Sequence, residues 1–228
     1  MKGTSYLRYR RLAPWYDAGV KLLALPFGGE AALRGKVLGL LPLNPGDNVL
    51  EVGCGTGTVM LMAADLVGPG GEVVGIDPSA EMIARARRKI AKSNLSQGAV
   101  LQGAGAPLPF SDCSFNSVIF FLVLHEMVQE DRIDSLHEAL RVLKPGGHLL
   151  VGDFSRPESP VGRLLQQLML LPEEEEAADF LRRGLQTIIR EGSAGALTEV
   201  KRERLVLGLL QGVLYVKNAK KEPGCSSR

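Results

Sequence analysis

The sequence lacks the features that mark several common classes of protein. It contains only three cysteines, Cys54, Cys113 and Cys225, and no CxxC pair, so a zinc site is not indicated. Lysine and arginine number 27 against 25 aspartates and glutamates, a balance that provides no broad positive field for nucleic acid. We therefore expect neither a metal centre nor a nucleic-acid-binding protein.

Long apolar segments are also missing. The stretch 22–27 is too short for the core of a secretion signal, and the run 205–216 is interrupted by Gly208, Gln211 and Gly212. A membrane-spanning helix needs roughly 20 apolar residues. We expect a cytoplasmic protein without a membrane span.

The composition is that of a globular protein with a sizeable core, since 45% of the residues are hydrophobic and 23% are charged. The length of 228 residues suits one α/β domain. We expect a single domain over residues 1–217, with N-terminal cap helices in 1–45, a helical lid in 155–195 and a flexible tail over 218–228.

Strand and helix patterns alternate along most of the chain. Apolar, β-branched runs bounded by glycine and proline predict strands at 48–52, 72–77, 100–101, 117–121 and 148–154. Helical spacing lies between them, at 58–67, from Pro78 onward and at 131–143. Two helical stretches, 161–171 and 173–190, then precede strands near 198–207 and 209–217. We expect a doubly wound α/β fold with a seven-stranded, mostly parallel, Rossmann-like sheet and a C-terminal antiparallel hairpin.

A glycine-rich loop follows the first strand in the run VLEVGCGTG. Gly53, Gly55 and Gly57 let the backbone approach a ligand closely, and the next helix offers unpaired N–H groups. The dinucleotide fingerprint GxGxxG would need glycine at position 58, which is Thr58. The loop therefore predicts a cofactor site that is not that of a dinucleotide enzyme.

An aspartate ends the second strand, twenty-four residues after the first glycine of the loop. A carboxylate at this position can accept hydrogen bonds from both hydroxyls of a ribose. Asp77 is therefore the second expected anchor of the cofactor.

These motifs resemble those of class I S-adenosylmethionine-dependent methyltransferases. The resemblance covers residues 9–157 and rests on VLEVGCGTG, VVGIDPS and RVLKPGGHLLVGDFSRP. Within that superfamily the chain is most similar to the ubiquinone and menaquinone C-methyltransferase group, through LPFSDCSFNSVIF, LHEALRVLKPGG and DFSRP. The end of the sheet region, GLLQGVLYVKNAK, resembles that group faintly.

The resemblance implies that S-adenosyl-L-methionine is the cofactor and that particular residues surround it. Glu51 and the three loop glycines would lie around the methionine part, Asp77 would hold the ribose, and Met82 or its neighbours would line the adenine. Cys54, Pro78, Ala104 and Leu122, at the ends of the same strands, complete the expected cofactor-binding set.

Two positions depart from the pattern of the resembled group. Ala104 stands where an aspartate usually binds the adenine amine, so recognition there would depend on the backbone or be weaker. Asn116 replaces the usual aspartate at the start of the fourth strand. We expect Asn116 to affect strand geometry more than chemistry.

Three residues are candidates for the catalytic chemistry. His125 and Asp153 follow or end the fourth and fifth strands, so they face the same edge and could hold an acceptor anion. His125 could instead cap or pack beside the next helix, and Asp153 could instead order the chain through backbone N–H groups. Tyr16 resembles an N-terminal aromatic that covers the cofactor, or it could form an ordinary core staple with Trp15.

The expected function is methyl transfer to a small, hydrophobic acceptor, a quinone-like ring or a lipid, by direct in-line displacement. The amphipathic spacing of Leu164, Leu168 and Leu185 predicts an apolar lid, although the same stripes could pack on the sheet. The alternative is a regulatory or scaffold protein that binds S-adenosylmethionine without turnover. A lipid-soluble partner leaves room for peripheral contact with a membrane, and the sequence does not give the oligomeric state.

Overall fold

The computed structural model describes residues 28–93, 95–170 and 175–219. Seven strands form one sheet in the order β3-β2-β1-β4-β5-β7-β6. The first five strands pair in parallel, while β7 runs antiparallel to both β5 and β6. The strands are β1 Asn48–Val52, β2 Glu72–Asp77, β3 Gly98–Gln102, β4 Phe115–Phe121, β5 Leu143–Phe154, β6 Leu197–Leu205 and β7 Leu210–Lys217. The predicted doubly wound fold with a closing antiparallel hairpin is confirmed.

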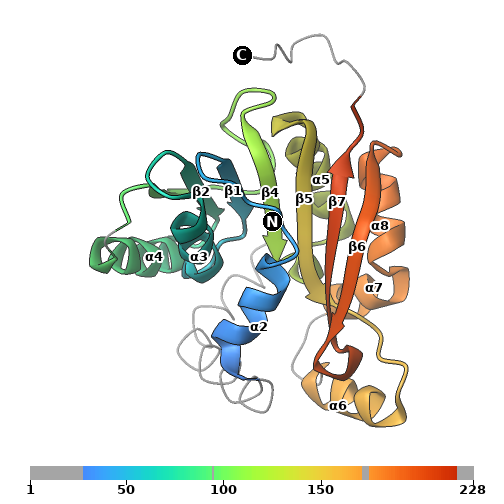
Figure 1. The fold of residues 1–228 in the computed structure, drawn as a ribbon. Coiled ribbons are helices and arrows are strands. Elements are labelled where there is room, and N and C mark those ends of the chain that lie inside the picture. Colours follow the sequence, from blue (N-terminus) through green and yellow to red (C-terminus); the bar gives the residue numbers. More distant parts are fainter. Residues whose placement is uncertain (1–27, 94, 171–174, 220–228) are drawn as a thin grey trace.

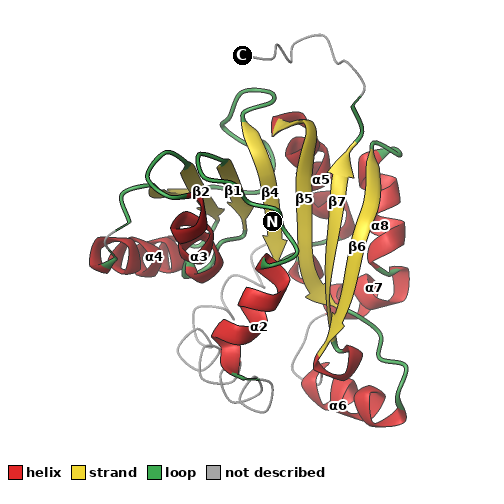
Figure 2. Ribbon diagram, viewed as in Figure 1, coloured by secondary structure: helices red, strands yellow, loops and turns green. Residues whose placement is uncertain are grey.

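Helices cover both faces of this sheet (Figures 1 and 2). They are α2 Gly29–Leu38, α3 Thr58–Val67, α4 Ala80–Lys92, α5 Gln129–Val142, α6 Pro160–Leu170, α7 Glu175–Arg183 and α8 Leu185–Ser193, with 3-10 turns η2 Leu124–Glu126 and η3 Val206–Gly208. Side chains from α2, α3 and α4 form one apolar core, and those from α5, α7 and α8 form the other. Central strands buried on both faces, as β1 and β4 are, explain the continuous apolar runs in the sequence.

The region after β5 differs from the prediction of two helices. The second predicted helix is broken at Gly184, where φ is 75°, so that α7 and α8 are separate. The apolar side chains of both helices, including Phe180, Leu185 and Ile188, are buried in the core against the sheet. Helix α7 packs on η2 and α8, and α8 packs on α5. Much of the apolar stripe of the second predicted helix is thus used in the core. The lid over 155–195 stays a prediction, and the side chain of Leu168 is outside the described part.

The start of β5 and the segment after β7 differ from the prediction. β5 begins at Leu143, and the predicted Lys-Pro-Gly-Gly turn forms an irregularity in its pairing with β4, with Gly146 at φ 73°. At the other border, the backbone N–H of Asn218 donates to Ala196 and the amide of Asn218 donates to Gly195. The predicted tail is thus anchored at its first residue, and residues 220–228 lie outside the described part.

Within the described ranges, no helix has the length and apolar character needed to cross a lipid bilayer.

Candidate cofactor and catalytic site

The three glycines of the loop after β1 all adopt left-handed backbone conformations. Their φ angles are 72° at Gly53, 51° at Gly55 and 74° at Gly57. Glycine reaches this region without steric cost, which explains why these positions are not occupied by larger residues. The loop ends at the N-terminus of α3, where backbone N–H groups have no partner inside the helix.

The loop is tightly packed on one side and open on the other. A Cβ atom on Gly53 would lie 2.3 Å from a methyl carbon of Val123, so the loop packs closely against the residue that precedes η2. A Cβ atom on Gly55 would meet no atom of the described residues within 4 Å. Gly55 therefore faces open space of the kind that a bound cofactor needs.

Asp77 holds this loop as well as ending β2. Its two carboxylate oxygens accept hydrogen bonds from the backbone N–H groups of Gly55 and Ser79, each at 2.8 Å. Burial raises the pKa of Asp77, and the hydrogen bonds from Ser79 and Gly55 oppose that shift. Each carboxylate oxygen retains a second lone pair, so the predicted contact with a ribose is compatible with this geometry.

Glu51 is a buried carboxyl group beside the loop, with 2% of its surface exposed. Its Oε2 atom has no hydrogen-bond partner among the described residues. Burial raises its pKa to about 8, while the positive charge of Arg34 on α2 acts in the opposite direction. An unpartnered buried polar atom beside an open cradle is the feature expected where a polar ligand group binds.

The other predicted cofactor residues lie around the same edge. Pro78 directly follows Asp77 and is half-buried, and Met82 is buried at the start of α4. Ala104 is exposed after β3. Leu122 directly follows β4 with φ 53°, and its N–H donates to the carbonyl oxygen of Gly152 at 2.7 Å. The thiol of Cys54 is buried, which raises its pKa and leaves it protonated.

His125 and Asp153, which the sequence suggested separately, form a buried pair. His125 Nδ1 lies 2.7 Å from Asp153 Oδ1, and the exposed fractions of the two residues are 2% and 1%. The carboxylate also accepts the backbone N–H groups of Leu124, His125 and Phe154. With Asp153 as acceptor, the proton of the imidazole resides on Nδ1 and Nε2 is the basic nitrogen.

The surroundings of this pair are aromatic. The Phe154 ring centroid lies 4.3 Å from that of His125, and the Phe180 ring of α7 lies 6.5 Å from it. Glu126 Oε1 is 3.8 Å from His125 Nε2. Asp153 thus orders three backbone N–H groups, as one of its two alternatives predicted, and it also orients the imidazole; its role toward an acceptor stays a prediction. Tyr16, the third candidate, lies outside the described residues.

The sequence interpretation missed Lys89, because a lysine in the basic run 85–89 of α4 looks like part of a solvated helix face. Lys89 Nζ donates to the hydroxyls of Thr56 and Thr58, at 2.7 and 2.8 Å. It therefore fixes the cofactor loop from α4. The available signal was its spacing of seven residues from Met82 and three from Ala86, which are both buried on the inner face of that helix.

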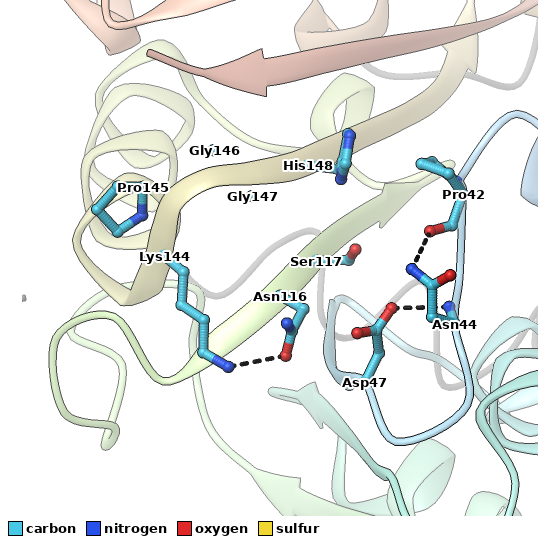
Figure 3. Close-up of a pocket in the computed structure, with 10 residues that line it drawn as sticks. All are labelled: Pro42, Asn44, Asp47, Asn116, Ser117, Lys144, Pro145, Gly146, Gly147 and His148. Carbon is cyan, nitrogen blue, oxygen red and sulfur yellow. Dashed lines mark hydrogen bonds between the residues drawn. The ribbon is translucent and has the colours of Figure 1, made fainter. Parts of the chain in front are cut away.

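A pocket of about 180 Å³ lies at the opposite edge of the sheet, at the amino ends of β4 and β5 (Figure 3). There Asn116 Oδ1 accepts hydrogen bonds from the Asn48 N–H at 3.0 Å and from Lys144 Nζ at 2.9 Å. Asn116 thus links three strands, in agreement with the expected role in strand geometry. Because ligands of such sheets bind at the carboxyl ends, this pocket is not the cofactor site.

Comparisons with known proteins agree with a cofactor site at the carboxyl ends of β1 and β2. Residues 49–147 match the family of the methyltransferase domain. The demethylmenaquinone methyltransferase of Lactobacillus johnsonii is 35% identical over 157 residues, which are 68% of this chain and 63% of the relative. The chloroplastic 2-phytyl-1,4-beta-naphthoquinone methyltransferase of Arabidopsis thaliana is 32% identical over 165 residues, 71% of this chain and 62% of the relative. The chain thus spans less than two thirds of the length of these relatives.

Solved structures show the same fold at lower identity. An S-adenosylmethionine-dependent methyltransferase from Aquifex aeolicus aligns with a TM-score of 0.64 at 23% identity, covering 81% of this chain and 89% of that one. The cyclase SpnF aligns with a TM-score of 0.66 at 20% identity, covering 85% and 82%. The open cradle at Gly55 and the unpartnered Glu51 carboxyl fit S-adenosyl-L-methionine, the cofactor of this group. The chain carries a methyltransferase domain over residues 49–147 and is similar to the quinone methyltransferase group of the class I S-adenosylmethionine-dependent superfamily.

Proposed function

We propose that this protein transfers a methyl group from S-adenosyl-L-methionine to a small hydrophobic acceptor, a quinone-like ring in its reduced form. The observation that carries the proposal is the buried His125–Asp153 pair beside the cofactor loop. The names of the similar proteins, which methylate demethylmenaquinone and a phytyl naphthoquinone, support the choice of acceptor.

The cofactor would be held by the loop at the carboxyl ends of β1 and β2. Gly55 would lie against its methionine part, Glu51 would face a positively charged group, and Asp77 would bind the ribose. When bound, S-adenosyl-L-methionine supplies a methyl group that its sulfonium already activates. The chain has to align the acceptor with that group and to exclude water.

The His125–Asp153 pair would manage the proton of the acceptor. A hydroquinone becomes a better carbon nucleophile when it loses a hydroxyl proton, and His125 Nε2 is the group that would take this proton. Asp153 would hold the imidazole in the required tautomer and stabilise its positive charge. After methyl transfer the methylated ring carbon would lose its proton to solvent, and the imidazolium would return its proton to the ring oxygen, which restores the hydroquinone.

The proposal is tested by turnover of the purified full chain. We expect S-adenosylhomocysteine and a ring-methylated product from a reduced demethylnaphthoquinone with a short prenyl chain, and no product from phospholipid or amine acceptors. Calorimetric binding of S-adenosylmethionine without product from any of these acceptors would contradict the proposal and favour a scaffold protein.

Glu51 provides a prediction about pH. At pH 7 a carboxyl group whose pKa is about 8 is mostly protonated, and a cationic ligand beside it favours the ionised form. We expect cofactor binding at pH 7 to release a proton, and affinity to increase as the pH rises toward 8. Calorimetry in two buffers of different ionisation enthalpy measures the release.

The matched variants for this prediction are Glu51→Gln and Glu81→Gln. Glu81 is exposed in the first turn of α4, so its replacement should leave the proton release unchanged. Glu51→Gln should abolish the release. An equal release from the Glu51→Gln protein would show that another group titrates on binding.

Asp77 provides a second prediction. Replacing Asp77 with asparagine should weaken cofactor binding by about 1–3 kcal/mol, because a charged acceptor for hydroxyl groups is lost. The same change also disturbs the hydrogen bond to Gly55, so affinity alone is ambiguous. A cofactor analogue without ribose hydroxyls resolves this, since it should bind the native and Asp77→Asn proteins with nearly equal affinity. An undiminished effect of the substitution on the analogue would remove Asp77 from the ribose site.

A further inference from the structure

Three large apolar side chains are exposed at one end of the molecule. Val161 and Leu164, in the first turns of α6, are 62% and 59% exposed, and Leu207 in η3 is 55% exposed. The two segments touch, because a Cβ atom on Gly162 would lie 3.0 Å from the carbonyl oxygen of Leu207. Single exposed apolar residues are ordinary, but here three gather on adjoining segments. We call residues 156–164 and 206–208 the α6–η3 tip.

The backbone of this tip is strained in a way that exposes Leu207. Val206 and Leu207 have φ angles of 52° and 56°, in the left-handed region that β-branched and bulky residues rarely adopt. Neighbouring contacts hold this turn, since the Ser155 N–H donates to Leu209 and the Ser155 hydroxyl donates to Gly208. A strained turn that directs a leucine to solvent indicates that the exposed side chain has a use.

The charges around these side chains are mainly positive. Arg156 and Arg163 are exposed, and neither forms an ion pair with any residue of the described ranges. Arg204 is paired with Glu158, the acidic residue of this tip. Helix α6 has no acidic residue over Pro160–Leu170. The apolar side chains are thus flanked by two arginines that are available for an anionic surface.

The tip adjoins the candidate catalytic site. Phe154, whose ring contacts His125, ends β5 two residues before Arg156. Helix α6 lies across the carboxyl end of the sheet (Figure 1). This is the orientation in which an amphipathic helix can rest on a membrane surface. The acidic residues Glu175 and Glu176 begin α7, which packs on η2 and α8.

We infer that the α6–η3 tip docks on a bilayer containing anionic lipids. Leu207, Val161 and Leu164 enter the headgroup region while Arg156 and Arg163 contact lipid phosphates. This inference deepens the proposed function, because a hydrophobic acceptor dissolved in the bilayer would then reach the protein beside His125. The arginines beside these apolar side chains favour an anionic membrane as the partner. A second copy of the chain carries the same positive charges at its own tip, so two tips would repel each other.

The test is co-sedimentation of the full chain with vesicles of phosphatidylcholine, alone or mixed with phosphatidylglycerol. We expect binding to the mixed vesicles that decreases at high salt. Leu207→Asn and Leu164→Gln should each weaken this binding about tenfold, because an inserted apolar side chain is lost. Asparagine suits a left-handed backbone, so the Leu207→Asn protein should melt at an unchanged or higher temperature. Leu66→Gln, which alters a leucine 53% exposed on α3, is the matched control and should bind normally.

Two results would overturn the inference. One comes from the vesicle experiment: either the native, Leu207→Asn and Leu164→Gln proteins all bind mixed vesicles equally well, or none of them binds. The other is a dimer in solution that these two substitutions dissociate, which would assign the tip to contact between copies. Vesicle binding is measured without an acceptor, and turnover is measured with a water-soluble short-chain acceptor. Failure of the docking inference is therefore distinct from failure of the proposed function.

Discussion

Replacing Asp153 with asparagine is expected to lower turnover by about 10²- to 10⁴-fold, which is the usual contribution of a positioned acid–base group. The geometry of the pair explains the size of this effect. Asp153 Oδ1 accepts the His125 Nδ1–H and the Phe154 N–H, while Oδ2 accepts the N–H groups of Leu124 and His125. Both oxygens are therefore occupied by donors.

Asparagine cannot satisfy this arrangement, because its NH₂ group donates and does not accept. If the amide oxygen faces Leu124 and His125, the NH₂ group faces the imidazole and favours the tautomer with the proton on Nε2. That tautomer cannot take a proton from the acceptor. If the amide is reversed, two buried backbone N–H groups lose their acceptor, at a cost of about 1–3 kcal/mol each.

Single-turnover rates at saturating acceptor and cofactor are the appropriate measurement, together with cofactor affinity and melting temperature. His125→Gln should lower the rate by a similar factor and should remove the limb of the pH–rate profile that reports the base. His137→Gln is the matched control, because His137 is exposed on α5. Cofactor affinity should remain within about threefold of native in both variants of the pair, since neither residue belongs to the loop.

Full rates in both Asp153→Asn and His125→Gln would show that the pair only orders the chain after β4 and β5. In that case the melting temperature would fall for Asp153→Asn while the rate stayed constant. Such a result would also leave Tyr16, or a group of the acceptor itself, as the source of the base.

The parts of the fold that the sequence predicted closely are those with a local cause. Helix α3 was expected at 58–67 and β2 at 72–77, and both are observed with these bounds. Gly57 begins the helix in a left-handed conformation, and Gly68 follows its last residue. Such positions act through steric limits of the backbone, so they can be read from a single sequence.

The break at Gly184 shows the limit of the same reasoning. Apolar spacing continues through residues 173–190, and an isolated glycine is tolerated inside many helices. The helix ends there because the chain has to turn between α7, which contacts η2, and α8, which packs on α5. That requirement comes from tertiary contacts, which periodicity does not report.

The candidate site was predictable as separate residues and not as an arrangement. His125 and Asp153 were each located at a strand end, but their hydrogen bond depends on β4 and β5 being neighbours with Phe121 opposite Gly152. Arg34 and Lys89 were missed, because exposed and inward-turning cations look alike in a sequence. Fold alone does not decide the reaction, since the cyclase SpnF has the same architecture.

Replacing Arg132 with methionine is the other change for which we expect a large effect, a loss of roughly 3 kcal/mol of stability. Arg132 is fully buried and its guanidinium joins three elements. Nε donates to the Leu124 carbonyl of η2 at 2.8 Å, Nη2 donates to the Glu176 carbonyl of α7 at 2.7 Å, and Nη1 donates to Asp179 at 2.8 Å. Methionine fills much of the same volume but can donate none of these hydrogen bonds.

The stability is lost because the hydrogen-bond partners of Arg132 remain buried without a donor. Two carbonyl oxygens, those of Leu124 and Glu176, lose their donor, and each costs about 1–3 kcal/mol if no water replaces it. The free-energy cost at Asp179 is smaller, because its side chain is 28% exposed and Arg183 also contacts it at 3.1 Å. For a domain of this size the combined loss should lower the melting temperature by roughly 6–12 °C.

Two further variants separate the network from the charge. Asp179→Asn should cost about 1 kcal/mol or less, because Arg132 keeps its backbone acceptors and the carboxylate is partly solvated. Arg132→Lys should recover only part of the stability, since a single ammonium cannot reach acceptors on both η2 and α7. If Asp179→Asn were as destabilising as Arg132→Met, the ion pair would be the source of the stability. Because Leu124 precedes His125, we also expect the folded fraction of Arg132→Met to turn over more slowly at unchanged cofactor affinity; a native rate would show that η2 holds its position without this arginine.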